Sequence, residues 1–344
     1  MKHKQKLPFP LRLVKDYEKE HPHCWEYIEE FRERRGKDIP FWNDLVYIPL
    51  VDAHSIYKYK FNNGENNINE ASIYAAYAAW RQYKEIYTFS PELTEILFSQ
   101  ADEDVVIPID VLYQIPYNSI YISTSEAEGC FIFFEWNIIT KQMELRLCQV
   151  EEHGENTSIT NVWINLDSGN TISDSIRKGL DNLKYCMGGK TTYKLLIDGE
   201  YVKQTEEQMF TEMYRIASKY IQLVLYICAE NAEIEENPVQ KQITRKSKDN
   251  CPKDVFREIR SWDVGVKFAS NIRKTRWQGE TTKTEGSYGG NGVNKRPHTR
   301  KGHWHHYWVG SHSDNSRKLI LKWTAPTFVG GKAEDTITTI NRVK

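Results

Sequence analysis

The sequence has few of the features that mark a membrane, secreted or zinc-finger protein. Its six cysteines include no close pair, which excludes a C-x-x-C zinc knuckle and a dense disulfide framework. The apolar run 221–229, which contains Gln222, and the others in the chain are far shorter than the roughly 20 residues of a membrane span. Segment 1–6 is basic, but the proline-containing segment 7–10 follows where a secretory signal needs about 7 to 15 apolar residues. We therefore expect a cytoplasmic protein with reduced thiols and no membrane partner.

Apolar and aromatic residues are abundant enough to exclude disorder throughout the chain. Aromatic residues make up 12% of the 344 residues, and ten of them are Trp. A chain that stays solvated carries much less apolar surface than this. Since domains usually hold about 100 to 200 residues, the length predicts one elaborate domain or two ordinary ones.

The near-zero net charge hides a strong division between two parts of the chain. Residues 1–240 contain 24 basic and 38 acidic residues, a net charge of −14, whereas residues 241–344 contain 22 basic and 9 acidic residues, a net charge of +13. A basic surface attracts phosphate, and an acidic one attracts basic peptides. We therefore expect an acidic body, 1–240, that could bind a peptide, and a basic part, 241–344. A salt-bridged interface between the two parts is the alternative interpretation.

Hydrophobic periodicity predicts an α+β fold with a helical N-terminal region, a central antiparallel sheet and a long core helix. The predicted helices are 11–20, 25–35, 71–87, 91–98, 173–187 and 206–231, the last being the core helix. The predicted strands of the body are 119–123, 130–139, 143–147 and 162–166. In the basic part we expect a helix at 254–260, a mobile loop at 271–294, and strands at 264–268, 303–309, 318–323 and 327–329.

Five of the ten histidines lie between His298 and His312, within and just beyond a motif rich in His and Trp, 295–310. In an extended strand, alternate side chains point to opposite faces, so two sets of rings are expected. One face would carry His303, His305 and Tyr307, and the other would carry Trp304, His306 and Trp308. Pro297 and Gly302 would set the direction of the chain on either side of this strand.

Several functions are compatible with the motif. His303 and His305 could share a metal ion with His298 or His312, or act as acid and base on an RNA 2′-hydroxyl while Arg296 or Arg300 stabilises the phosphorane. The motif could also contact phosphate, bases or a peptide, or simply pack at a sheet edge. We expect a binding surface without metal, cofactor or catalysis. Its candidate residues are Arg296, His298, Arg300, Lys301, His303, Trp304, His305, Tyr307 and Trp308.

The same motif resembles the C-terminal signature of the type V-A anti-CRISPR proteins that lower the amount of an RNA-guided effector nuclease. The resemblance lies in 295–310 (KRPHTRKGHWHHYWVG) and 322–329 (KWTAPTFV). Shorter stretches in the first half and the core helix are also similar to the family: 78–81, 86–87, 107–108, 115–117 and 223–233. The resemblance therefore touches most of the chain in patches.

The resemblance implies that the protein recognises the N-terminal peptide of a type V-A effector during its synthesis and causes translation-dependent loss of the effector's mRNA. The peptide, and with it the ribosome or the message, are the partners that the resemblance suggests. Within this picture Trp80 and Arg81 are candidate peptide contacts, although the alternative interpretation places Trp80 in the core. Two other functions stay open: a His- or metal-dependent ribonuclease, and a nucleic-acid-binding protein of a mobile element without a CRISPR target.

Overall fold

The computed structural model describes residues 7–101, 106–138, 140–154, 156–167, 169–186, 193–197, 200–237, 258–281, 298–311 and 317–329. The helices are α1 Phe9–Glu20, α2 Cys24–Glu33, α3 Leu50–Lys60, α4 Ile68–Tyr83, α5 Pro91–Phe98, α6 Ile109–Leu112, α7 Ile172–Cys186, α8 Glu206–Cys228 and α9 Val266–Thr281. The strands are β1 Glu85–Phe89, β2 Ser119–Ser123, β3 Glu128–Asn137, β4 Gln142–His153, β5 Asn156–Asn165, β6 Tyr193–Ile197, β7 Glu200–Gln204, β8 Ile234–Glu236, β9 Arg260–Val264, β10 His298–Arg300, β11 His303–Val309, β12 Lys318–Thr324 and β13 Thr327–Val329.

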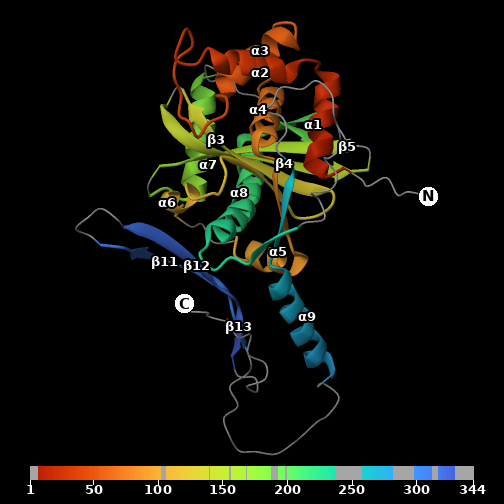
Figure 1. Ribbon diagram of the computed structural model, residues 1–344, viewed down its shortest axis with the longest axis vertical. Coiled ribbons are helices and arrows are strands. Elements are labelled where there is room, and N and C mark those ends of the chain that lie inside the picture. The colour runs from red at the N-terminus through yellow and green to blue at the C-terminus, as the bar shows by residue number, and fades with distance from the viewer. Residues whose placement is uncertain are drawn as a thin grey trace, which may run out of the picture.

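The described residues form a sheet in the order β7-β6-β5-β4-β3-β2-β1-β9-β8, with helices on both faces (Figure 1). The predicted α+β class is confirmed. The expectation of an antiparallel sheet is wrong in part, because β1 pairs in parallel with both β2 and β9. The predicted helix 71–87 is wrong at its C-terminal end, because residues 85–87 belong to β1. The helix ends at Tyr83, Lys84 takes a left-handed conformation with φ of 55°, and the strand begins at Glu85.

Two hydrophobic cores lie on opposite faces of the sheet, and β3 contributes to both by the alternation of its side chains. Phe131 and Phe133 pack with α1–α4, whereas Ile132 and Phe134 pack with α5–α8. A strand buried on both faces reads as a continuous apolar run, as the sequence predicts for 130–139. Cys24, Cys130, Cys148 and Cys228 are free thiols.

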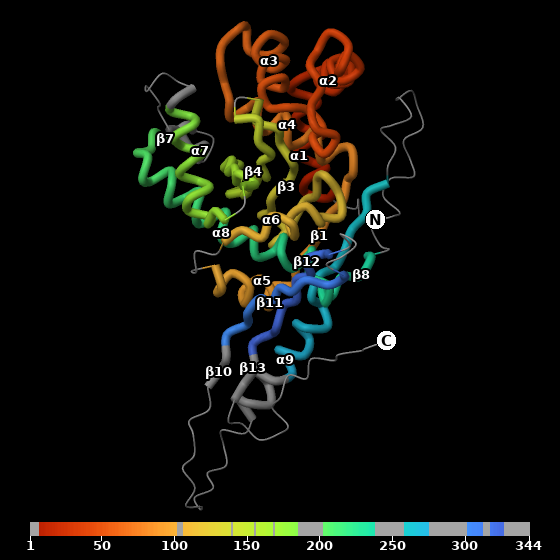
Figure 2. The backbone as a smooth tube through the Cα atoms, turned by 90° about the vertical axis from the view of Figure 1, so that its left-hand side faces the viewer, coloured from red at the N-terminus to blue at the C-terminus, as the bar shows by residue number. Residues whose placement is uncertain are grey.

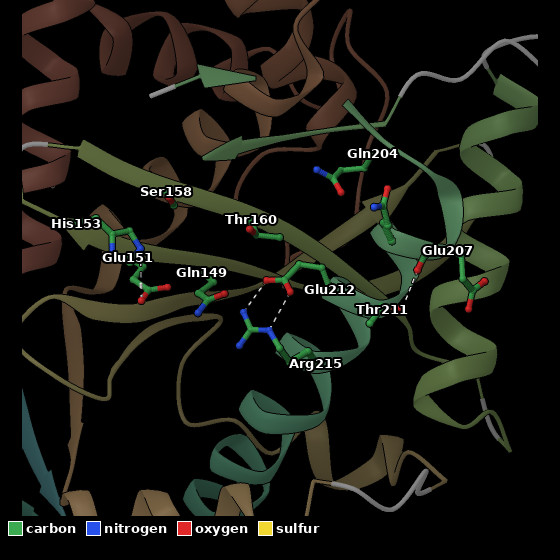
Figure 3. Close-up of a pocket in the computed structure, with 11 residues that line it drawn as sticks. Gln149, Glu151, His153, Ser158, Thr160, Gln204, Glu207, Thr211, Glu212 and Arg215 are labelled. Atoms are coloured by element: carbon green, nitrogen blue, oxygen red, sulfur yellow. Dashed lines mark hydrogen bonds and ion pairs between the residues drawn. The ribbon is translucent and has the colours of Figure 1, made fainter. Parts of the chain in front are cut away.

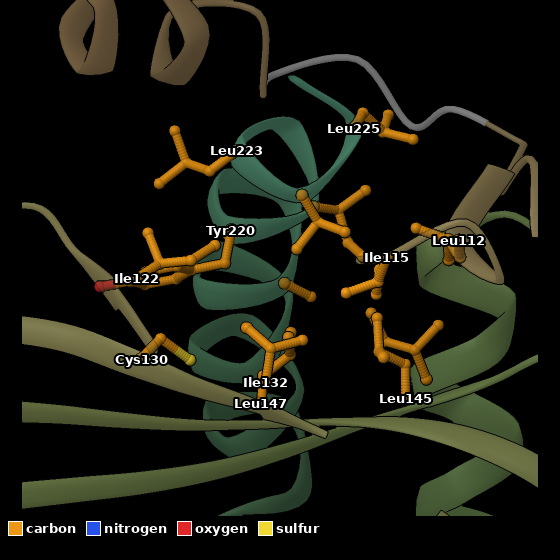
Figure 4. Packing of buried hydrophobic residues seen from close by; sticks show 14 of the residues in the cluster. Leu112, Ile115, Ile122, Cys130, Ile132, Leu145, Leu147, Tyr220, Leu223 and Leu225 are labelled. Atoms are coloured by element: carbon orange, nitrogen blue, oxygen red, sulfur yellow. The ribbon is translucent and has the colours of Figure 1, made fainter. Parts of the chain in front are cut away.

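Helix α8 is the central element of the second core (Figure 4). Thr205 and Gln208 form a reciprocal capping box at its N-terminus, which fixes where the helix begins. In this view Tyr220 lies beside Ile122 of β2 and near Cys130 of β3, and Leu112 of α6 lies on the other side of the helix. The predicted core helix 206–231 is thus confirmed over 206–228. None of the helices in the described part of the chain is long and apolar enough to cross a membrane.

The region after residue 258 differs from the sequence expectation. The predicted strand 264–268 is wrong, because the strand is β9 at 260–264 and a helix follows it. The expected loop 271–294 is wrong over 271–281, which belong to α9, while 282–294 lie outside the described residues. The predicted helix 254–260 lies largely outside them too, and Arg260 begins β9. Hence β9, from the basic part, belongs to the same sheet as the acidic body.

A distant carboxylate explains why α9 has no local signal in the sequence. Glu233, at the start of the chain segment that leads into β8, accepts hydrogen bonds from the backbone amides of Lys267 and Phe268 (2.9 Å for Phe268). This is the role of a helix N-cap, here supplied by a residue more than thirty positions away.

Candidate functional site

Strands β11 and β12 form an antiparallel ribbon at the end of the molecule opposite α2 and α3 (Figures 1 and 2). Trp304 pairs with Trp323, and Tyr307 pairs with Ile320. The predicted strand 303–309 is confirmed, and so is the expected division of its rings between two faces. We call residues 298–311 and 317–329 the ribbon segment.

The inner face of the ribbon is anchored to the C-terminal half of α8 and the turn after it. Trp304 Nε1 donates to Gln222 Oε1 at 2.6 Å. Trp323 is 5% exposed, and its ring lies edge-on to the rings of Tyr226 and Phe268, each with centroids 5.4 Å away. Because both Trp rings are held in this way, the root of the ribbon is fixed on the body.

Asn231 also holds the ribbon through the backbone of β12. Its Nδ2 donates to Trp323 O at 2.8 Å, and its Oδ1 accepts from Trp323 N at 3.0 Å. The amide of Glu230 donates to Leu321 O at 2.9 Å. These bonds satisfy polar groups along one edge of β12, as an additional strand would.

Gly302 lies in a crowded position. A Cβ atom here would lie 2.3 Å from Nε2 of the flexible Gln100 side chain and 3.1 Å from both Pro326 Cδ and Thr324 O. A side chain at residue 302 would therefore require Gln100 and the ribbon root to shift.

The outer part of the ribbon presents its rings and charges to solvent. Trp308 is 52% exposed and Tyr307 is 37% exposed. His303, His305 and His306 are exposed, as are Lys301 and Lys318. Tyr307 donates to Glu230 Oε2 at 3.2 Å, and Lys322 Nζ lies 2.9 Å from the same oxygen. This pairing lowers the pKa of Glu230.

His303 and His305 lie side by side, with their Nε2 atoms 2.8 Å apart. One imidazole can therefore donate to the other. In the part of the chain that the structure describes, no carboxylate bonds to either ring, and no group of three or more His, Cys, Asp and Glu side chains is placed to hold a metal ion. Of the further ligands considered, His312 and the side chain of His298 lie outside the described residues.

The remaining candidate residues lie either outside the described residues or in α4 of the body. Arg296 and the side chain of Arg300 lie outside the described residues. Trp80 is fully buried, donates from Nε1 to Glu85 O at 2.9 Å, and packs edge-on to Phe131, so its placement among the peptide contacts is corrected to the core. Arg81 is half-buried, with its guanidinium 5.3 Å from the ring of Trp25.

A polar pocket of about 540 Å³ lies between β4, β5 and the N-terminal half of α8 (Figure 3). We call it the acidic pocket. Strand β4 contributes Gln149, Glu151 and His153, and α8 contributes Glu207, Glu212 and Arg215. Ser158 and Thr160 of β5 lie beside them.

Carboxylates dominate the electrostatics of the acidic pocket. Glu212 holds Arg215 in a two-point pair, with Oε1–Nη2 at 2.6 Å and Oε2–Nε at 2.9 Å. This pair raises the pKa of Arg215, with smaller contributions from the charges of Glu128 and Glu151. The lining of the pocket thus carries three carboxylates, those of Glu151, Glu207 and Glu212, against one guanidinium.

The acidic pocket was not predicted, although two signals in the sequence point to it. Residues 149, 151 and 153 are polar at the spacing of one strand face. Residues 207, 208, 211, 212 and 215 form a polar stripe on α8, opposite its apolar stripe. What the sequence does not show is that the two stripes face each other.

Known proteins resemble this chain in sequence and in fold. Residues 87–331 match the model of the AcrVA2-like, anti-CRISPR type V subtype A2 family. Protein FinQ of Escherichia coli is 24% identical over 336 residues, covering 92% of this chain and 89% of FinQ. The crystal structure of AcrVA2 is similar in fold, with a TM-score of 0.54, 15% identity, and coverage of 93% of this chain and 98% of that one. Since the family model spans most of the chain, including the acidic pocket and the ribbon, this protein belongs to the AcrVA2-like anti-CRISPR family.

Proposed function

We propose that this protein inhibits a type V-A CRISPR system by binding the N-terminal peptide of the effector nuclease during its synthesis, and that this binding leads to loss of the effector's mRNA. Membership of the anti-CRISPR family supports the general function. The observation that carries the peptide-binding step is the acidic pocket, whose three carboxylates face a single guanidinium, that of Arg215.

The lining of the acidic pocket suits an extended basic peptide. Glu151, Glu207 and Glu212 can pair with Lys or Arg side chains, and Gln149 and Thr160 can bond to peptide amides. The volume falls within the range of typical ligand pockets, roughly 300 to 1,000 Å³. An incoming cation would compete with Arg215 for Glu212, so binding would exchange one charge-assisted pair for another.

Fluorescence polarisation with a labelled synthetic peptide from the effector's N-terminus tests this step. We expect saturable binding by the wild type and about tenfold weaker binding by Glu212→Gln, because a hydrogen bond to a charged group contributes about 1.5 to 3 kcal/mol and Arg215 is left to repel the peptide. Glu65→Gln is the matched control, since Glu65 is exposed in the turn between α3 and α4. Absence of saturable binding at concentrations of tens of micromolar would contradict the proposal.

A ribonuclease is the second candidate, favoured by the adjacent imidazoles of His303 and His305. A positioned acid or base contributes about 10²- to 10⁴-fold, so His303→Ala would abolish cleavage of naked message by purified protein. We expect no such cleavage from the wild type, because no described carboxylate orients either ring. Cleavage that is lost in His303→Ala would make the protein itself the nuclease.

A further inference from the structure

We infer that the ribbon segment is a binding surface for single-stranded RNA, with bases stacking on its exposed rings and phosphates meeting its cations. The inference deepens the proposed function and rests on it for the identity of the RNA, since the message is attached to the same ribosome as the nascent peptide. The argument for the surface itself comes from charge, ring exposure and anchoring.

Charge on the ribbon segment is of one sign. Its residues include five Lys and Arg and no Asp or Glu. The cations are Arg300, Lys301, Arg317, Lys318 and Lys322. The single nearby carboxylate among its described contacts is Glu230 of the body, which pairs with Lys322. Residue 314, in the connection between β11 and β12, is an Asp, so the whole stretch 298–329 carries a formal charge of +4. On a protein whose first 240 residues carry −14, this favours a polyanion at the ribbon.

Exposed rings lie on both faces of the ribbon. On the outer face His303 and His305 lie edge to face, with ring centroids 4.5 Å apart, and Tyr307 follows two residues further along the strand. Trp308 emerges from the other face with half of its surface in solvent. Surfaces for single-stranded nucleic acids combine such rings with cations, because every base has a π-face that can stack.

A single strand fits these rings better than a duplex. Bases inside a duplex are already stacked on one another and cannot lie on Tyr307 or Trp308 without being unpaired. A duplex would meet only the cations, and replacing a ring would then have little effect. The effect of a ring substitution on RNA affinity therefore distinguishes single-stranded RNA from duplex RNA as the ligand.

The ribbon is also organised before any ligand arrives. Trp304, Trp323 and Asn231 fix its root on α8 and the following turn, while Trp308 lies beyond these anchors. Substituting Trp308 therefore removes a stacking surface and leaves the fold in place. Preorganisation lowers the entropic cost of binding.

The test uses the purified full chain and a labelled single-stranded RNA of about 16 nucleotides, the upper end of common site sizes. We expect saturable binding that weakens roughly 5- to 150-fold in Trp308→Ala, the fold-change for loss of stacking on one base. Lys318→Ala should reduce the slope of log affinity against log salt by about 0.7. Tyr59→Ala is the matched control, because Tyr59 is 72% exposed with Lys58 Nζ 5.3 Å from its ring, yet lies on α3 of the acidic body.

Four results would overturn the inference: no RNA binding at low salt, RNA binding unchanged in Trp308→Ala, tighter binding of duplex RNA, or tighter binding of single-stranded DNA of the same sequence. The peptide assay, run on the same variants, separates this inference from the proposed function. Loss of RNA binding with intact peptide binding in Trp308→Ala supports both. If the wild type binds RNA and no peptide, the ribbon inference stands and the proposed function fails. If it binds peptide and no RNA, the reverse holds.

Discussion

The acidic pocket and the ribbon are both built on α8, yet they differ in charge and in how they are held. Residues 207–215 of the helix line the pocket, whereas Gln222 and the turn after Cys228 anchor the ribbon. From Glu212 to Gln222 the helix rises about 15 Å at 1.5 Å per residue. One rigid helix therefore fixes the spacing between a surface suited to a basic peptide and a surface suited to a polyanion.

The two regions also depend on different contacts. The pocket has walls of sheet and helix that belong to the two large cores. The ribbon reaches only the second core, through Leu319, Leu321 and Trp323 of β12, and is held there by hydrogen bonds of Trp304 and Asn231. Changes in the core should therefore affect both regions, whereas changes at the anchors should affect the ribbon alone.

Trp80→Ala is expected to have the largest effect, because it removes a fully buried ring between α4 and the sheet. Such a change costs about 3 to 5 kcal/mol of unfolding free energy. Chemical denaturation should show this loss, and both peptide and RNA binding should fall together near the lowered midpoint. Tyr59→Ala should change the unfolding free energy by less than about 0.5 kcal/mol. An unaltered denaturation midpoint for Trp80→Ala would contradict its place in the core.

Glu135 should make the stability of the body dependent on pH. Burial raises its pKa to about 8 from an ordinary 4.5, against the opposing effects of Arg146 and the amide of Leu50, while Glu144 and Asp52 add to the rise. Between pH 4.5 and 8 the unfolded chain loses this proton and the folded protein retains it. Stability should therefore decrease as pH rises through this window, by up to about 1.4 kcal/mol per pH unit.

The variant Glu135→Gln removes the titration and should flatten this dependence. Urea denaturation of both proteins at several values across the window measures it. Equal slopes for the wild type and the variant would show that Glu135 is ionised in the folded protein.

Asn231→Ala should loosen the ribbon and leave the acidic pocket unchanged, with a smaller loss of unfolding free energy than Trp80→Ala. It removes two hydrogen bonds to the backbone of Trp323, each contributing about 0.5 to 1.5 kcal/mol. Amide hydrogen exchange in β12 should accelerate, while exchange in β4 and the affinity for peptide stay at wild-type values. Asn62→Ala, which removes one exposed bond to Glu65 O, is the control. Unchanged exchange in β12 would mean that Asn231 does not hold the ribbon.

Local patterns in the sequence predicted the elements that are stabilised locally. The apolar periodicity of α8 and the alternation of β11 are read from neighbouring residues, and both elements are found where expected. Elements that depend on distant residues were missed. The N-terminus of helix α9 is capped by the carboxylate of Glu233. Strand β1 is stabilised by pairing with β2 on one side and β9 on the other. The acidic pocket belongs to the same class, since its two polar stripes meet only through the fold.

Sequencing the messages that co-purify with the protein from cells translating a type V-A effector tests the central claim most directly. If the acidic pocket binds the nascent peptide, the effector's message should be enriched, and the enrichment should disappear when nascent chains are released from ribosomes before purification. Glu212→Gln should reduce the enrichment, and Glu65→Gln should not. Absence of enrichment, or enrichment that persists after the nascent chains are released, would contradict recognition through the peptide.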